Sequence, residues 1–437
     1  MRILSITAGA AGMYCGSCFR DNGLAAELIA RGHDVTLIPV YTPTRTDEAN
    51  VSRPDVLFGG ISVYLQQYSS LFRKTPRFLD RLWDSPRVID AFAGRGISPD
   101  ARVLGEMTIS TLQGEEGVLR KEFEKLVEWT QDEPPPDVVN IPNSLLIAMA
   151  RPLKRAFQRP VLCTLQGEEL FLSELATPYR DRAVAMIRQR VRDVDQFIAV
   201  SEYCAEFMTR YLDIPADRMS VVPLGISMTG YSRRDPATRD EEYRVGYFAR
   251  VAPEKGLLEL AEAYVRFRRR AGAARVGLHA AGYMAPSHRD YLAKARAVLE
   301  REGLGEEFTY HGALDRDGKL AYLRRLNVLS VPATYDEPKG MFLLESMAAG
   351  VPVVQPRRGA FIEVVEKTGG GLLVPPADPD ALADGLHRLW ADRELSTQLA
   401  NRAFDGVRAH YTIAASATRQ LEVYAAASRR APAGQPC

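Results

Sequence analysis

The stretch RILSITAGAAGMYCGSCFRDNGLAAELIARGHDVTLIPV, residues 2–40, contains two short apolar runs separated by an amphipathic segment. The two runs, RILSITA and DVTLIPV, have the length and composition of buried β-strands. Between them Leu24, Leu28 and Ile29 recur at helical spacing, and Gly32 ends the helical pattern. The stretch therefore predicts a strand, a helix and a second strand parallel to the first.

The same alternation of apolar runs and amphipathic segments continues along nearly the whole chain. Further strands are expected in the first half at DVVNIP (137–142), PVLCTL (160–165) and QFIAVS (196–201), and in the second half at RVGYFARV (244–251), RVGLHAAG (275–282), EFTYHG (307–312), VLSVPA (328–333), VPVVQP (351–356) and GLLVPP (371–376). This pattern is typical of an α/β protein with two doubly wound, Rossmann-like domains. Ligands of such sheets bind beyond the carboxyl ends of the strands, and the cleft between the domains is the expected site.

The domain boundaries follow from where this alternation breaks. We expect an N-terminal domain at residues 1–228 with an insertion at about 43–136, and a C-terminal domain at 240–405. The polar stretch SRRDPATRDEE (232–242) is expected to connect them. Residues 406–428 are expected to form a C-terminal helix that packs back on the N-terminal domain, and 429–437 a flexible tail.

Composition restricts the class of partner. The chain has 437 residues and a formal net charge of +1, so charge gives no reason to expect nucleic acid as a partner. The N-terminus lacks the features of a secretory signal, and no apolar stretch reaches the ~20 residues that span a bilayer. We therefore expect a cytoplasmic protein with reduced cysteines.

Cys15 and Cys18 form a CxxC motif, which is compatible with a redox site or with half of a zinc site. The other cysteines make no second pair: Cys163, Cys204 and Cys437. No histidine lies between His33 and His279, so ligands of suitable spacing for zinc are missing. We favour structural or incidental cysteines, and a redox role remains the alternative.

Two loops of the second half carry groups suited to the phosphates and hydroxyl groups of a ligand. YFARVAPEKG (247–256) places Arg250 and Lys255 around a helix start, where cations form an anion site, although a solvated basic loop would have the same composition. In YDEPKGMFLLESMAAGVPVVQP (335–356), Glu337 precedes a helix that begins after Gly340, and Glu345 follows eight residues later. Carboxylates spaced in this way can accept hydrogen bonds from hydroxyl groups, and the helix buries three apolar side chains on the sheet: Leu343, Leu344 and Met347.

These motifs resemble the retaining, nucleotide-sugar-dependent glycosyltransferases of the GT-B type, in particular the group-1 or family-4 class. Glu337 and Glu345 match the family's E-x7-E signature, and FARVAPEKG resembles its phosphate loop. RGHDV (31–35), VSEY (200–203), VVPLGI (221–226) and AAGVPVV (348–354) also resemble family segments. The resemblance covers nearly the whole chain except the insertion, and it implies the GT-B architecture of two Rossmann-like domains facing a cleft.

The resemblance implies a role for each candidate residue. Arg250 and Lys255 would hold the donor diphosphate and neutralise the leaving nucleotide. Glu345 would bind the nucleotide ribose, and Glu337 would bind the donor sugar with the backbone amides of three residues: Gly340, Met341 and Phe342. The family implies retention of the anomeric configuration, a nucleotide-diphosphate sugar as co-substrate, and neither a cofactor nor a bound metal.

The sequence departs from the family pattern at two positions. The family usually has paired glycines before its first helix, and here only Gly16 of Cys15 and Gly16 matches. Gly16 would allow close backbone approach to the donor or acceptor. A histidine common after the strand equivalent to PVLCTL is replaced by Gln166, for which we expect a catalytic contact with the donor sugar.

Gln166 belongs to the second copy of a hexapeptide, TLQGEE, that occurs at 111–116 and at 164–169. The first copy precedes the helical stripe Leu119, Phe123, Leu126 and Val127, and Ser110 with Gln113 fits a capping box. The first copy is therefore expected to begin a helix. The second follows a strand, and its Gln166 and Glu168 are expected to face the cleft.

The acceptor is not identified by the sequence, and a glycan or a lipid-linked molecule fits the class. The insertion segment VYLQQYSSLFRKTPRFLDRLW (63–83) places four cations among aromatic residues: Arg73, Lys74, Arg77 and Arg81. Such a segment can rest on the anionic inner face of a membrane, although a helical cap with solvated cations is the favoured interpretation.

Three other classes remain as alternatives. A nucleotide-sugar epimerase or hydrolase would use the same fold without an acceptor. A noncatalytic nucleotide-sugar-binding protein would bind the donor without turnover. A dinucleotide oxidoreductase is disfavoured because no GxGxxG follows the first strand.

Overall fold

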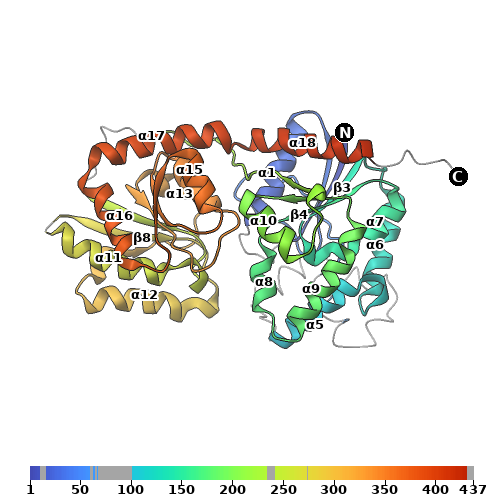
Figure 1. Ribbon diagram of the computed structural model, residues 1–437, viewed down its shortest axis with the longest axis horizontal. Coiled ribbons are helices and arrows are strands. Elements are labelled where there is room, and N and C mark those ends of the chain that lie inside the picture. Colours follow the sequence, from blue (N-terminus) through green and yellow to red (C-terminus); the bar gives the residue numbers. More distant parts are fainter. Residues whose placement is uncertain are drawn as a thin grey trace. The chain divides into compact units, whose positions relative to one another are not determined.

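The computed structural model describes residues 1–9, 16–59, 63, 66, 101–233, 242–272 and 274–430. The chain divides into two compact units, Met1–Pro223 with Ser416–Cys437, and Leu224–Ala415. Within the described residues each unit is a six-stranded parallel sheet covered by helices (Figure 1). The expected fold class, an α/β protein of GT-B architecture with two doubly wound, Rossmann-like domains, is confirmed.

The N-terminal unit has the strand order β2-β1-β3-β4-β5-β6. Its strands are β1 (Arg2–Thr7), β2 (Asp34–Pro39), β3 (Val138–Ile141), β4 (Val161–Leu165), β5 (Gln196–Ala199) and β6 (Met219–Val221). Its described helices are α1 (Gly16–Ala30), α5 (Ala101–Gln113), α6 (Arg120–Asp132), α7 (Ala150–Phe157), α8 (Glu168–Glu174), α9 (Tyr179–Arg190), α10 (Glu202–Tyr211) and α18 (Ile413–Arg430).

The C-terminal unit has the strand order β12-β11-β10-β7-β8-β9. Its strands are β7 (Tyr243–Phe248), β8 (Val276–Ala281), β9 (Phe308–Tyr310), β10 (Val328–Leu329), β11 (Val353–Pro356) and β12 (Gly371–Val374). Its described helices are α11 (Leu257–Ala271), α12 (Arg289–Arg301), α13 (Arg316–Arg324), α14 (Met341–Ala348), α15 (Phe361–Thr368), α16 (Pro379–Ala391) and α17 (Arg393–His410).

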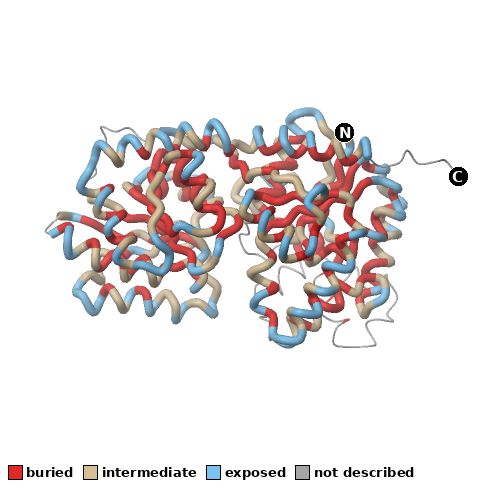
Figure 2. The backbone as a smooth tube through the Cα atoms, viewed as in Figure 1, coloured by how far each residue is buried: buried red, intermediate tan, exposed pale blue. Residues whose placement is uncertain are grey.

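The strands form because their residues are apolar on both faces. In β3, β4 and β5 every residue is buried, as a parallel sheet covered by helices on both faces requires (Figure 2). All the strands that the sequence predicted are present in the structure. The three-residue strand β6 was not predicted, because its central Ser220 interrupts the apolar pattern.

Short 3-10 helices join several of these elements: η1 (Gly114–Glu116), η2 (Ser144–Met149), η3 (Val191–Asp193), η4 (Ala216–Arg218), η5 (Pro253–Lys255), η6 (Pro286–His288) and η7 (Gly305–Glu307). Side chains at the N-caps fix the starts of α10, α13, α16 and α17. Ser201, Asp315, Asp378 and Asp392 each accept a hydrogen bond from a backbone N–H of the first helical turn.

The C-terminal helix expected at 406–428 belongs to the N-terminal unit as predicted, but its bounds differ. α17 ends at His410 and α18 begins at Ile413. Between them Thr412 forms a β-bridge with Ile226, and the backbone of Ile226 exchanges hydrogen bonds with Tyr411 and Ile413. This pairing replaces the helical hydrogen bonds at that point. The first unit ends at Pro223 and the second begins at Leu224. The boundary therefore lies before the stretch 232–242 that we expected to connect the two domains.

The capping box expected at the first TLQGEE copy is wrong. Ser110 lies inside α5, where its hydroxyl donates to the carbonyl of Glu106. Gln113 is the last residue of that helix, and the carbonyls of Leu112 and Gln113 accept hydrogen bonds of 2.9 and 3.0 Å from Arg190 of α9. The first copy therefore ends a helix, because a neighbouring helix satisfies its final carbonyls.

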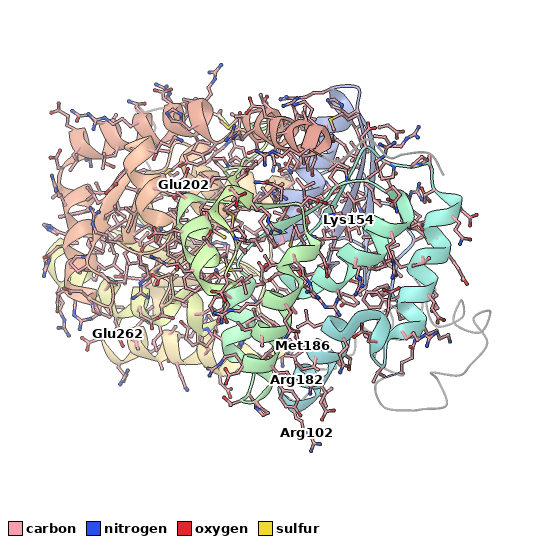
Figure 3. The ribbon with its side chains drawn as sticks, turned by 45° about the vertical axis from the view of Figure 1, so that its right-hand side comes forward. Arg102, Lys154, Arg182, Met186, Glu202 and Glu262 are labelled. Atoms are coloured by element: carbon pink, nitrogen blue, oxygen red, sulfur yellow. The ribbon has the colours of Figure 1, made fainter. Side chains whose placement is uncertain are left out.

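α5 and α9 lie against each other in the N-terminal unit, and Figure 3 labels Arg102 on α5 and Arg182 and Met186 on α9. A Cβ at Gly105 would lie 2.5 Å from the ring of Tyr179, so α9 approaches α5 closely there. Because the two helices are this close, the Arg190 side chain of α9 reaches the carbonyl groups at the end of α5.

Several sequence-based expectations fall outside the described residues. They concern Cys15 and the basic insertion residues Arg73, Lys74, Arg77 and Arg81. Cys18 lies in α1 and is buried, as are Cys163 and Cys204. Ile29, expected on the buried face of α1, is exposed. Of the helices that the structure describes, none is long and apolar enough to span a membrane.

Candidate active site

The site is built on two neighbouring strands of the C-terminal unit. β7 and β10 are parallel partners, so the loops that follow them leave the same edge of the sheet. The backbone N–H of Thr334 in the second loop donates to the carbonyl of Glu254 in the first, at 3.0 Å. A Cβ at Gly256 would lie 2.0 Å from the carbonyl oxygen of Pro332, so the two loops touch at a position that only glycine allows.

This contact brings Lys255, Tyr335 and Glu337 together. The Lys255 ammonium donates to the Tyr335 hydroxyl at 2.6 Å and forms an ion pair with the Glu337 carboxylate. The Tyr335 hydroxyl also donates to Glu337. The ammonium lies 4.9 Å from the centre of the Tyr335 ring, within the range of a cation–π interaction.

The Glu337 carboxylate is ionised in this setting. Its side chain is only 4% exposed, and burial by itself raises the pKa of a carboxyl group. The charge and hydrogen bond of Lys255, together with the hydrogen bond of Tyr335, outweigh burial and lower the pKa of Glu337 to about 2. Glu337 is therefore a hydrogen-bond acceptor throughout the physiological range.

The start of α14 supplies backbone donors next to Glu337. Gly340 is the N-cap residue and has a positive φ of 69°. The N–H groups of Met341 and Phe342 belong to the first helical turn, where no intrahelical acceptor exists. Together with the helix dipole, they favour an oxygen-rich ligand at this point.

Glu345 lies about one turn after the start of α14 and is held by Lys319 of α13. The Lys319 ammonium donates to Glu345 Oε1 at 2.6 Å, and the two side chains are 5% and 9% exposed. Oε1 of Glu345 is therefore already hydrogen-bonded to a side chain of the protein.

Arg250 does not join the Lys255 cluster. Its guanidinium donates to Glu254 at 3.0 Å, one turn along the same loop, and its side chain is 43% exposed. The cation therefore remains accessible to a ligand.

The N-terminal unit holds the other two candidates, Gly16 and Gln166. Gly16 is the first residue of α1, and no described atom lies within 4 Å of a Cβ built on it. Gln166 follows β4 directly and is 4% exposed. Its backbone N–H donates to Glu168, whose carboxylate also accepts from the N–H of Ser144, so Glu168 fixes the loop.

Three residues of this arrangement were not found by sequence reasoning. Tyr335 stands two positions before Glu337, and this i, i+2 spacing in an extended loop was an available signal. Lys319 and Asp21, which contact Glu345 and Gln166, carry no sequence signal because each is one polar residue of an amphipathic helix. In the part of the chain that the structure describes, no group of three or more metal-binding side chains is found.

The two parallel sheets and the lysine–carboxylate site after β7 and β10 define a class, the glycosyltransferases of GT-B architecture. Comparison of the sequence with known families agrees: residues 22–225 match the glycosyl transferase 4-like domain, and residues 231–405 match the glycosyl transferases group 1. The chain belongs to the group 1, family-4-like glycosyltransferases.

Individual relatives share part of their length with this chain. A GDP-mannose-dependent alpha-(1-6)-phosphatidylinositol monomannoside mannosyltransferase of Mycobacterium tuberculosis is 29% identical over 57% of this chain and 66% of its own. An uncharacterized glycosyltransferase of Methanocaldococcus jannaschii is 27% identical over 52% and 59%, respectively. The matches thus span less than two thirds of these relatives.

Solved structures show the same fold along the whole chain. The sucrose-phosphate synthase of Thermosynechococcus elongatus has a TM-score of 0.70 at 19% identity and covers 98% of both chains. HepE of Anabaena, crystallised with UDP-glucose, has a TM-score of 0.65 at 16% identity and covers 98% of this chain and 100% of its own.

Proposed function

We propose that this protein transfers a sugar from a nucleotide-diphosphate sugar to an acceptor hydroxyl with retention of the anomeric configuration. The observation that carries the proposal is the cluster of Lys255, Tyr335 and Glu337 beside the start of α14. An ammonium, a buried carboxylate and the N–H groups of the first turn of α14 in one place suit a ligand that has both phosphate and hydroxyl groups.

Arg250 and Lys255 hold the donor diphosphate in this proposal. Negative charge accumulates on the diphosphate as the glycosidic bond breaks, and fixed cations stabilise that charge most strongly in the transition state. Lys255 has three N–H donors, so it can bind a phosphate oxygen while it remains in contact with Glu337. The reaction needs neither a metal ion nor another cofactor in this proposal.

Glu337 accepts hydrogen bonds from hydroxyl groups of the donor sugar, and the amides at Gly340, Met341 and Phe342 bind its oxygens. Glu345 binds the ribose through the carboxylate oxygen that Lys319 does not engage. In the N-terminal unit, Gly16 allows the protein backbone to approach the donor diphosphate or the acceptor closely, and Gln166 contacts the sugar.

The comparisons support a nucleotide sugar as the donor. One structural neighbour was crystallised with UDP-glucose, and one relative is named as GDP-mannose-dependent. The latter name also includes a lipid acceptor, so a lipid-linked acceptor or a glycan fits this chain, with peripheral contact at the inner face of the membrane in the lipid case.

A thermal-shift panel of UDP, GDP, ADP and their sugars tests the donor site. A ligand at ~100 times its dissociation constant adds about 2.7 kcal/mol of stability. We expect one nucleotide to stabilise the wild type, and Arg250→Ala and Glu345→Ala to respond much less. Arg393→Ala, exposed at the start of α17, is the control and should respond fully. Equal shifts in all variants would contradict the proposed site.

Turnover assays separate this function from its alternatives. A transferase consumes the donor faster when the acceptor is present, an epimerase or hydrolase does not depend on an acceptor, and a noncatalytic protein binds without turnover. Anomeric configuration of the product, read by NMR, tests retention. EDTA should leave the rate unchanged, and a loss that a divalent ion restores would contradict metal-free transfer.

A further inference from the structure

The amide of Gln166 uses both of its hydrogens inside the N-terminal unit. Its Nε2 donates to Asp21 Oδ1 at 3.2 Å and to the carbonyl of Pro142 at 3.1 Å. Its carbonyl oxygen, Oε1, is buried and has no hydrogen-bond partner among the described residues. A buried acceptor without a donor is unfavourable, so this oxygen is suited to a donor supplied by a ligand.

The surroundings allow only one orientation of this amide. Rotation by 180° would place Oε1 against Asp21 Oδ1 and the Pro142 carbonyl, which are both acceptors. The Asp21 side chain is 2% exposed, and the guanidinium of Arg20 contacts the same carboxylate at 3.1 Å. This neighbouring cation favours the ionised form of Asp21, and an ionised carboxylate can accept a hydrogen bond from Gln166 but cannot donate one.

Arg20 is anchored in turn by the C-terminal helix. Its Nη2 donates to Gln420 Oε1 of α18 at 3.1 Å, and the Arg20 side chain is 5% exposed. α1 and α18 lie side by side, as a second contact between Arg31 and Thr418 also shows (Figure 1). A continuous series of buried side chains, each hydrogen-bonded to the next, therefore runs from Gln420 through Arg20 and Asp21 to Gln166.

We propose that Asp21 is a positioning residue that fixes the Gln166 amide so that only its carbonyl oxygen is presented, and that this oxygen accepts a hydrogen bond from a sugar hydroxyl of the substrate. The inference rests on the proposed transfer reaction for the identity of the ligand. The orientation of the amide rests on the structure alone.

Gln166→Glu tests the orientation without any substrate. The variant replaces the donating NH₂ with an oxygen that faces Asp21 and the Pro142 carbonyl. The new carboxyl must keep a proton to hydrogen-bond there, so its folded pKa rises above the unfolded value of about 4.3. Its contribution to stability is present at low pH and is lost as the pH rises through the folded pKa.

Melting temperature is therefore measured from about pH 5 to about pH 8 for Gln166→Glu, Asp21→Asn and the double variant. The ionisable groups around the new carboxyl are Asp21, Arg20, Glu168 and Tyr424, and the wild type measures their own titration. Gln166→Glu should lose stability relative to wild type as the pH rises. In the double variant the new amide at position 21 donates to the new carboxylate, so this loss should disappear.

A Gln166→Glu variant whose melting temperature follows the wild type at every pH would overturn the inference, and so would one that is unfolded at pH 5. A variant that is folded at about pH 5 and unfolded at about pH 8 supports it. Asp21→Asn alone should lose stability by an amount that does not change with pH, because Arg20 is left buried without its counter-charge while the new amide oxygen still accepts from Gln166. A loss that grows with pH in this single variant would count against the inference.

Activity is the second readout, once a donor and acceptor pair is known. The variant Arg20→Leu, Asp21→Leu removes the ion pair as a unit, so no charge remains buried alone. We expect kcat to fall by roughly tenfold to a hundredfold, because the freed amide loses its orientation, while KM for the donor changes little. Asp21→Asn should retain most of kcat.

The two proposals fail in different ways. If the wild type turns over no nucleotide sugar, the proposed function is wrong and the melting experiment still tests the amide. If transfer occurs but the double leucine variant keeps full kcat, Asp21 does not position Gln166 for the reaction.

Discussion

At the scale of single residues, the buried ion pair of Lys255 and Glu337 has a large energetic consequence. The side chains are 11% and 4% exposed, so each charge depends on the other for compensation. Removing one partner of such a pair leaves an uncompensated buried charge.

We predict that Glu337→Gln lowers the free energy of unfolding by roughly 3–5 kcal/mol at pH 7, because Lys255 loses its counter-charge. The double variant Lys255→Met, Glu337→Gln removes both charges and should recover most of that loss. Urea unfolding of both variants measures the difference. Equal destabilisation of the single and double variants would show that the charges do not depend on each other.

The same pair predicts a dependence on pH. The pKa of Glu337 is lowered from 4.5 to about 2 in the folded protein, so its stabilising contribution is complete above pH 4.5 and is lost as the pH falls toward 2. The difference in melting temperature between wild type and Glu337→Gln should therefore be constant near neutral pH and should shrink in acid. A difference that stays the same in acid would contradict the lowered pKa.

At the scale of elements, helix α11 is bounded by two glycines of positive φ. Gly256 precedes it with φ 76°, and Gly272 follows it with φ 63°. A Cβ at Gly256 would meet the Pro332 carbonyl at 2.0 Å, whereas a Cβ at Gly272 would meet nothing within 4 Å.

Alanine substitutions at these two glycines test whether the contact between the loops after β7 and β10 matters. Gly272→Ala should cost about 1 kcal/mol, because it introduces only backbone strain. Gly256→Ala also places a side chain at a positive φ, in the left-handed region, and in addition pushes apart the loops after β7 and β10. It should therefore be more destabilising and should abolish the thermal shift with nucleotide diphosphate. Thermal melts with and without nucleotide measure both effects. Similar behaviour of the two variants would show that the loop contact is dispensable.

The repeated TLQGEE segment shows how far context overrides local sequence. At 111–116 it ends helix α5 and forms η1, whereas at 164–169 it ends strand β4 and begins α8. In the first copy Arg190 of α9 binds the last carbonyls of the helix, and in the second Thr164 and Leu165 pair with β5. Neither partner can be inferred from six residues.

At the scale of the whole molecule, the chain returns to the N-terminal unit after completing the C-terminal one. The Ser416 hydroxyl donates to the carbonyl of Pro223, and Tyr424 of α18 is 1% exposed. Helix α18 is therefore part of the core of the N-terminal unit although it is last in sequence.

We predict that Tyr424→Ala lowers the stability of the N-terminal unit by about 3 kcal/mol, in the range for removing a large buried side chain. Amide hydrogen exchange resolved by peptide should show faster exchange in the N-terminal unit, while protection of β7 to β12 stays unchanged. Arg419→Ala, on the exposed side of α18, is the control. Faster exchange confined to the C-terminal unit would contradict the assignment of α18.

The sequence by itself determined the fold class, nearly all of the strands and the family. It also selected Arg250, Lys255, Glu337 and Glu345, because apolar runs and short motifs are local properties of the chain. Strand β6, the break between α17 and α18, and the end of α5 were not predictable, since each depends on a partner elsewhere in the fold.

Only the tertiary structure decided which groups meet. Lys255 and Glu337 lie 82 residues apart, and Gln166 and Asp21 lie 145 residues apart. The first pair forms because the adjacent strands β7 and β10 end at the same edge of their sheet. The second pair forms because α1, which carries Asp21, packs against the loop that follows β4. The partner of a buried charge or amide is determined by packing between distant segments, so it cannot be predicted from a local sequence pattern.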